Sequence, residues 1–139
     1  MDLKSALCRY LINQQIVGQR VYQKRLPQRD GSITGGLPAI VVSLISDRQL
    51  SSSHVIINGQ RCLNRRHSAR VQIDLIGTLP SDPLEQIKER LITWLSLLKG
   101  DLGGIKVESI TFDRSYDQDL LDVGHDRIVS DYKIVYVRS

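Results

Sequence analysis

The chain has 139 residues, of which 41% are hydrophobic and 24% are charged, and its formal net charge is +4 at pH 7. This length suits one domain with a single core, so we expect one domain over residues 1–139, and the longest apolar run, residues 37–45, is too short to span a bilayer. The charge permits contact with phosphate or with an acidic partner, but it is below that of a dedicated nucleic-acid-binding protein.

The N-terminal segment predicts a helix over residues 2–14. Its apolar residues recur at helical spacing, Asp2 is placed to cap the first turn, and Gly18 follows the end. The segment carries charge throughout, unlike a signal peptide. With no signal peptide and no membrane-spanning run, we expect a soluble, unexported protein. Cys8 and Cys62 lie in unrelated segments without CxxC spacing, so we expect reduced thiols in an intracellular compartment.

The middle of the chain predicts three strands. Residues 37–46 are almost continuously apolar and rich in β-branched side chains, which indicates a central strand that is covered on both faces. Residues 47–53 are polar, and we expect little regular structure there. The pair Asn58-Gly59 lies between two apolar runs and predicts a two-residue hairpin turn, because both turn positions need positive φ. Residues 69–77 alternate apolar and polar side chains, as a half-buried strand does.

A second helix is predicted within residues 82–100, with Pro83 as its first helical residue. Residues 101–113 and 127–139 predict two more strands, and residues 114–126 between them are predicted to be an acidic, turn-like segment. The expected fold is therefore α/β of the α+β kind: two helices packed on one face of a mixed, mainly antiparallel sheet, with a protruding β-hairpin.

No motif for catalysis, metal binding or nucleotide binding occurs in the sequence. The histidines and cysteines lack metal-ligand spacing, and neither a phosphate-binding glycine loop nor a nucleophile motif is present. A cluster of carboxylates offers the ligands that hard cations prefer, but its spacing matches no calcium loop, and a solvated loop is the simpler interpretation. The cluster consists of Asp113, Asp117, Asp119, Asp122 and Asp126. We therefore expect no enzyme activity and no cofactor.

The predicted hairpin joins apolar strands to a basic end. Its charges are consistent with a nucleic-acid-binding arm, an arm that clasps a neighbouring subunit, or an ordinary hairpin with solvated side chains. The apolar content exceeds what a freely solvated ribbon should carry, because an isolated hairpin is only marginally stable and exposed apolar strands associate. We therefore expect the hairpin to pack against something.

Several segments carry a resemblance to a known family. They are Arg20–Tyr22 with Leu26–Gln28, the Leu37-Pro38 pair that opens a strand, and the Ala69–Asp74 strand. Over nearly its whole length the chain resembles the small tail-completion proteins of long-tailed phages and prophages, the group of tail terminator and tail-to-head joining proteins. It departs from the family pattern in having a long, arginine-rich segment before residue 69.

The resemblance implies two helices against a sheet, assembled into a closed ring that is usually a hexamer. The ring would cap the finished tail tube, stop further polymerisation of tube subunits and offer the surface to which the filled head attaches. The implied partners are the tail tube protein and a head-completion or connector protein. The implied place is the head-proximal end of the tail in the virion, after assembly in the host cytoplasm, and DNA would pass through the lumen without specific binding.

A ring built by head-to-tail contacts needs a heterologous interface that closes, and the apolar hairpin is the candidate for it. The candidate subunit-interface residues are Val55, Ile57 and Leu63, and the candidates for the ring rim or lumen are Arg61, Arg65 and Arg66.

Two other classes of function stay open on the sequence alone. The alternative to the ring is a small basic nucleic-acid-binding domain, in which the hairpin arginines gather on one face with Lys24, Arg25 and Arg29. A small enzyme would need a concave pocket with convergent polar groups, which no sequence pattern indicates or forbids.

Overall fold

The computed structural model describes residues 2–25, 28–29, 32–33, 36–78, 83–120 and 125–138. Within the strands, the side chains at positions 28–29, 32–33, 51–53, 55, 57, 62–64, 117–120 and 125 lie outside this description. The elements in chain order are α1 (Leu3–Asn13), β1 (Val21–Gln23), β2 (Gln28–Arg29), β3 (Ser32–Ile33), β4 (Ala39–Ile57), β5 (Gln60–Thr78), α2 (Leu84–Leu97), β6 (Gly100–Asp101), β7 (Ile105–Leu120) and β8 (His125–Arg138).

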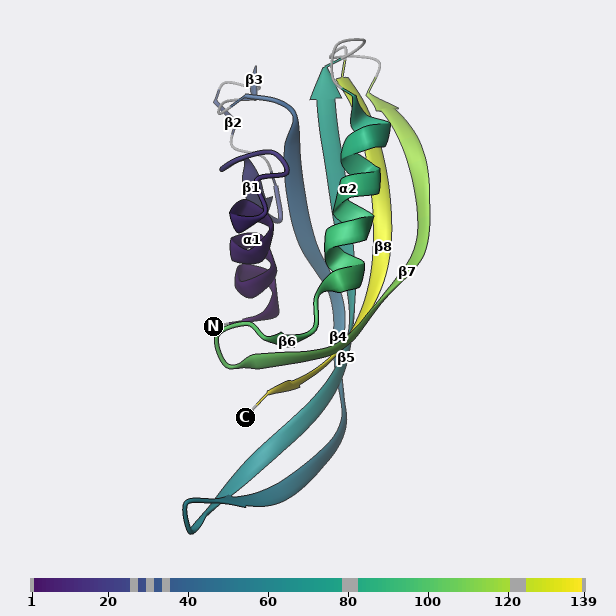
Figure 1. Ribbon diagram of the computed structural model, residues 1–139. Coiled ribbons are helices and arrows are strands. Elements are labelled where there is room, and N and C mark those ends of the chain that lie inside the picture. Colours follow the sequence, from purple (N-terminus) through teal and green to yellow (C-terminus); the bar gives the residue numbers. More distant parts are fainter. Residues whose placement is uncertain are drawn as a thin grey trace.

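Six strands form one sheet in the order β1-β4-β5-β8-β7-β6, and β2 pairs with β3 in a separate ribbon. Strand β1 runs parallel to β4, whereas every other pair in the large sheet is antiparallel. Both helices lie on one face of the curved sheet, and the β4–β5 hairpin projects beyond it (Figure 1). The predicted α+β fold, with its mixed, mainly antiparallel sheet and protruding hairpin, is confirmed.

The first helix forms where the sequence predicts it. The Asp2 carboxylate accepts a hydrogen bond from the Ser5 amide at 2.8 Å, which satisfies one of the free N–H groups of the first turn. This hydrogen bond also lowers the pKa of Asp2. In the last turn of the helix, the Tyr10 hydroxyl donates a hydrogen bond to the Trp94 carbonyl oxygen at 2.9 Å and so joins α1 to α2.

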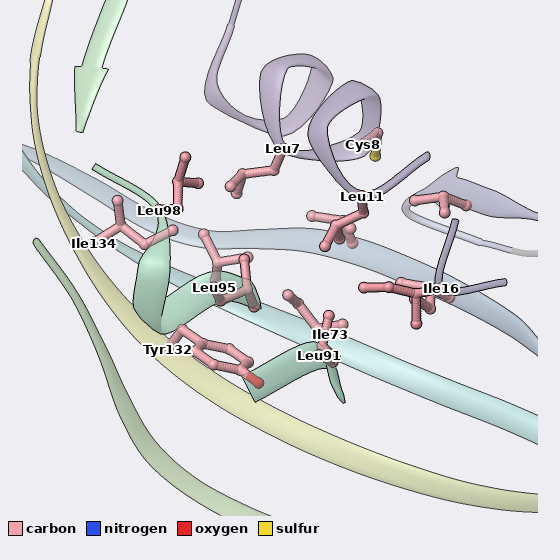
Figure 2. Packing of buried hydrophobic residues seen from close by; sticks show 14 of the residues in the cluster. Leu7, Cys8, Leu11, Ile16, Ile73, Leu91, Leu95, Leu98, Tyr132 and Ile134 are labelled. Atoms are coloured by element: carbon pink, nitrogen blue, oxygen red, sulfur yellow. The ribbon is translucent and has the colours of Figure 1, made fainter. Parts of the chain in front are cut away.

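The main core fills the space between the two helices and the sheet. Figure 2 shows Leu7 and Leu11 of α1 and Leu91 and Leu95 of α2 over the sheet, where they meet residues such as Ile73, Tyr132 and Ile134. Each of the four leucines is fully buried or nearly so. Burial of one such side chain stabilises the fold by roughly 1.5 to 3 kcal/mol, so the core holds the helices firmly on this face.

Residues 37–46 meet the prediction only in part. Ile40 and Val42 belong to the main core, and Ala39 and Val41 pack on the opposite face with a second, smaller cluster, so the start of β4 is covered on both faces. Further along the strand, however, Leu44 is 37% exposed and Ile45 is 58% exposed. The cover expected on both faces therefore ends before Leu44 within the described chain.

Three predicted boundaries are wrong. Residues 47–53 are not a loop but the continuation of β4, and the described part of 114–126 belongs to the paired strands β7 and β8. Helix α2 begins at Leu84, so Pro83 precedes the first helical residue instead of occupying it. In each strand the pairing partner extends the element through polar residues, which local preference alone does not predict.

Candidate assembly surface: the arm and two open sheet edges

The hairpin becomes a free ribbon where β8 ends. The last pair between β5 and β8 joins Arg65 to Arg138, and Arg65 in turn lies opposite Ser52 of β4. We call residues 52–65 the arm; Figure 1 shows it projecting away from the helices and the rest of the sheet. Its tip is the predicted two-residue turn, with φ of 50° at Asn58 and 78° at Gly59, and this prediction is confirmed.

The described side chains of the arm face solvent. Ile56 is 74% exposed, and Arg61 and Arg65 are also exposed. No arm residue whose side chain is described belongs to either hydrophobic cluster. The side chains of the predicted interface residues Val55, Ile57 and Leu63 lie outside the description, so their role stays a prediction.

The three predicted rim arginines differ in their surroundings. Arg66 Nε lies 2.9 Å from Glu108 Oε2, and both side chains are partly exposed, so this pair contributes little to stability. Arg61 and Arg65 form no ion pair with any side chain that the structure describes. The arm therefore carries one positive charge near its tip, at Arg61, and another at its root, at Arg65.

A polar cluster that the sequence did not reveal lies at the root of the arm. Asp47 of β4 receives two hydrogen bonds, one from the Tyr136 hydroxyl of β8 and one from His67 Nδ1 of β5 at 3.0 Å. Since a carboxylate only accepts, Nδ1 carries the proton in the second contact. The rings of His67 and Tyr136 stack with centroids 5.0 Å apart. The cluster joins β4, β5 and β8 close to the point where β8 ends and only β4 and β5 continue.

The same cluster sets the charge state of its phenol. Burial raises the pKa of Tyr136, and the hydrogen bond to Asp47 and its negative charge act in the same direction. Tyr136 is therefore a neutral donor at physiological pH, which is the state that its bond to the carboxylate requires.

Strand β4 presents a long open edge. Strand β1 pairs only with Ile40–Val42, and from Ser43 to Ile57 the outer edge of β4 has no partner strand among the described residues. Three apolar side chains along this stretch are exposed: Leu44, Ile45 and Leu50. Unpaired N–H and C=O groups beside exposed apolar side chains form a template for pairing with another chain.

The opposite side of the sheet has a second open edge. Strand β6 pairs only with Lys106 and Val107 of β7, so from Glu108 to Leu120 the outer edge of β7 has no partner strand in the described parts of the chain. Phe112 is 37% exposed and Tyr116 is 47% exposed on this strand. The sheet thus has two different open edges on opposite sides, and a head-to-tail contact joins two different surfaces of this kind.

Cross-strand ion pairs balance the charges of the sheet face that the helices leave uncovered. Arg70 pairs with Asp113 at 3.5 Å, Arg114 pairs with Asp131 at 2.9 Å, and the buried Asp74 receives Arg127. A face with alternating signs does not attract a phosphate backbone strongly. It therefore gives no support to nucleic-acid binding.

The basic residues also fail to gather as a nucleic-acid-binding face would require. Lys24 follows β1, where its amide donates to the Val42 carbonyl oxygen at 3.0 Å, and Arg61 lies opposite Ile56 at the end of the arm. The stretch of β4 between Val42 and Ile56 spans on the order of 40 Å at about 3.3 Å per residue. The side chain of Arg29 lies outside the description.

Nothing in the described chain forms a metal centre. No group of three or more His, Cys, Asp or Glu side chains that could hold a metal ion occurs among these residues. Of the acidic cluster, Asp113 faces Arg70, whereas Asp122 and the side chains of Asp117 and Asp119 lie outside the description.

Burial raises the pKa of Cys8 to about 11, so this thiol is not an activated nucleophile. Neither of the described helices is long and apolar enough to cross a membrane.

Comparison with known proteins identifies a shared fold. No family model matches the chain, and no curated protein matches it. Among solved structures, the chain is similar to one described as "Virion of native gene transfer agent (GTA) particle", with a TM-score of 0.54 and 16% sequence identity. The match covers 97% of this chain and 94% of the other. At this identity the likeness shows that the two chains share a fold over nearly their whole lengths.

Proposed function

We propose that this protein is a structural component of a phage or phage-like virion and, within that class, a tail terminator. It forms a ring that caps the tail tube, stops polymerisation of tube subunits and provides the surface for head attachment. Its place is the head-proximal end of the tail, and its partners are the tail tube protein and a head-completion or connector protein. It acts by binding alone, without a catalytic step or a cofactor.

The observation that carries this proposal is the pair of open sheet edges together with the arm. A chain that functions alone would be expected to shorten, cover or charge such edges, because they invite association. Here β4 leaves its edge unpaired from Ser43 onward and exposes Leu44 and Ile45 beside it. A permanent neighbour is the simplest physical reason for this arrangement.

Two further observations support the proposal. The fold is shared over nearly the full chain with a protein in the virion of a gene transfer agent, which is a phage-like particle. The balanced charges on the sheet face that the helices leave uncovered also suit a ring, since a lumen of mixed charge lets DNA pass without holding it.

The experiment that tests the proposal is co-assembly with the tail tube protein. Tube subunits that polymerise alone should give tubes of unlimited length, and added protein should halt their growth and leave a ring visible at one end by electron microscopy. Unchanged tube lengths, with no protein bound at tube ends, would contradict the proposal. Adding a chelator or a nucleotide should leave the result unchanged.

A further inference from the structure

The two open edges are related by the order of the strands. Strand β4 lies near one side of the sheet and β7 near the other, with β5 and β8 between them. Since each neighbouring pair in this series is antiparallel, β4 and β7 run in opposite directions within one chain. In a second copy, rotated about an axis that runs roughly along the strands, β4 keeps its direction. It can therefore lie antiparallel beside β7 of the first copy and continue the alternation of the sheet.

The two edges also match in their side chains. Leu44, Ile45 and Leu50 are exposed along β4, and the aromatic rings of Phe112 and Tyr116 are exposed along β7. Aromatic and aliphatic side chains on adjacent strands stabilise each other by roughly 0.2 to 1 kcal/mol per pair. Each edge thus offers the kind of side chain that the other lacks.

The two edges also differ in net charge. Residues 43–65, which make up the open stretch of β4 and the arm, carry three arginines and the single carboxylate Asp47. The open stretch of β7, residues 108–120, carries four carboxylates and the single cation Arg114. Opposite net charges favour contact between unlike edges and disfavour contact between two copies of the same edge.

The register of the sheet shows how the copies would be offset. Leu44 lies opposite Val71, which lies opposite Tyr132, which lies opposite Phe112, so these four residues share one level. From this level the open stretch of β4 runs mainly toward the arm, whereas that of β7 runs mainly toward Leu120 at the opposite end. The two stretches overlap fully only if neighbouring copies are staggered along the strands, and closure of a sheet with tilted strands requires such a stagger.

We infer that the open edge of β4 in one copy pairs antiparallel with the open edge of β7 in the next, so that one continuous sheet runs through the assembly. The partner is a second copy of this chain. Where the two open stretches overlap fully, the antiparallel pairing sets the Leu44 end of β4 beside the Leu120 end of β7 and the arm beside the Glu108 end. This inference rests on the proposed ring and adds to it which strands form the interface.

Paired cysteines test the inference directly. In a Cys62→Ser background, one substitution is placed on β4, Ile45→Cys or Leu50→Cys, and one on β7, Phe112→Cys or Tyr116→Cys. Cys8 can stay, because burial raises its pKa to about 11 and leaves little thiolate for oxidation. Within one chain two strands separate the pair, which is about 14 Å at ~4.8 Å per strand, whereas a disulfide needs Cα atoms within about 7 Å. Any disulfide must therefore join two copies.

Mild oxidation of the doubly substituted chains should give a ladder of covalent oligomers on a non-reducing gel for at least one of the four pairings. Chains with a single cysteine should give none, and neither should Ile45→Cys combined with Ser96→Cys on the exposed side of α2. Native mass spectrometry of the same samples reports whether the ring itself is present.

The outcomes separate the inference from the proposed function. An intact ring without a β4–β7 cross-link in any pairing would overturn the inference and leave the tail-terminator proposal standing. A cross-linked dimer from Ile45→Cys alone would overturn it too, because it would show a two-fold contact between β4 edges. A chain that stays monomeric at every concentration and on tube ends would overturn both.

Discussion

At the scale of single residues, the Asp47, His67 and Tyr136 cluster at the root of the arm is the most specific feature. We expect Tyr136→Phe to lower the free energy of unfolding by about 1 to 2 kcal/mol, because it removes a buried hydrogen bond to a carboxylate and keeps the ring stacked on His67. Urea unfolding measures this change. Tyr116→Phe on the exposed edge is the matched control and should change stability by less than about 0.5 kcal/mol. Equal effects of both substitutions would show that the cluster does not hold the arm.

The buried phenols and thiol also make stability depend on alkaline pH. Burial raises the pKa of Tyr132, Tyr136 and Cys8 in the folded chain above their ordinary values. The unfolded chain therefore loses these protons first as pH rises, and the free energy of unfolding should be steady near neutrality and fall above about pH 9. Urea titrations between pH 7 and 11 check this slope. Replacing Tyr132 and Tyr136 by Phe should flatten it, and an unchanged slope would show that other groups cause it.

We expect the arm arginines to affect the rate of ring formation more than the final amount of ring. Arg61 and Arg65 are exposed, and Arg66 forms an exposed pair with Glu108, so changing all three to Gln should alter stability by less than about 1 kcal/mol. If they guide the arm toward an acidic neighbour, the variant should form rings more slowly and with a weaker dependence on salt. Light scattering at two salt concentrations follows both. Complete loss of rings would place these side chains inside the interface instead of at its rim.

Some of these residue positions follow from the sequence and others do not. The Asp2 cap and the Asn58-Gly59 turn were predictable, because each depends on local chemistry. Asp47 was not. Counting outward from the turn would set it opposite Arg70, but β4 has an irregularity between Gln49 and Ser51, and the observed neighbour is Ala69. A bulge shifts the register without a reliable sequence signal.

At the scale of whole elements, the helices and the hairpin turn were predicted better than the lengths of the strands. Periodicity marks a strand only where one face is buried, and residues 47–53 have no such face, since the described positions there are exposed on both sides. The described part of the acidic stretch 114–126, residues 114–120 and 125–126, was wrongly expected to be turn-like. Its strand character comes from pairing with β8 over many residues, which no local pattern displays.

Replacement of residues 54–64 by a short Gly-Ser linker tests the arm as an element. The arm side chains that the structure describes take no part in the core, and closing a surface loop costs little, so we expect the variant to stay folded with a melting temperature close to that of the natural chain. Ring formation should weaken greatly, because each aliphatic side chain lost from an interface removes roughly 1.5 to 3 kcal/mol. Circular dichroism and size measurements record the two effects separately. An unfolded variant would assign the arm to the core, and a variant that still closes into rings would place the interface elsewhere.

At the scale of the whole molecule, the α+β architecture was predictable from two amphipathic helices and the number of strands between and after them. The open edges were not, because the sequence does not show where a strand stops having a neighbour. They became visible only through the short reach of β1 and β6, which cover a few residues of β4 and β7 and leave the rest unpaired. The features that bear most on assembly are thus properties of the sheet as a whole.

The central claim is that copies of this chain join head to tail into a closed ring, and native mass spectrometry of the purified protein over a range of concentrations, alone and with its tail tube protein, tests it most directly. We expect a single closed assembly, most simply of six copies, that persists on dilution or appears when the tube protein is added. A strictly monomeric chain under both conditions, at every concentration, would contradict the claim.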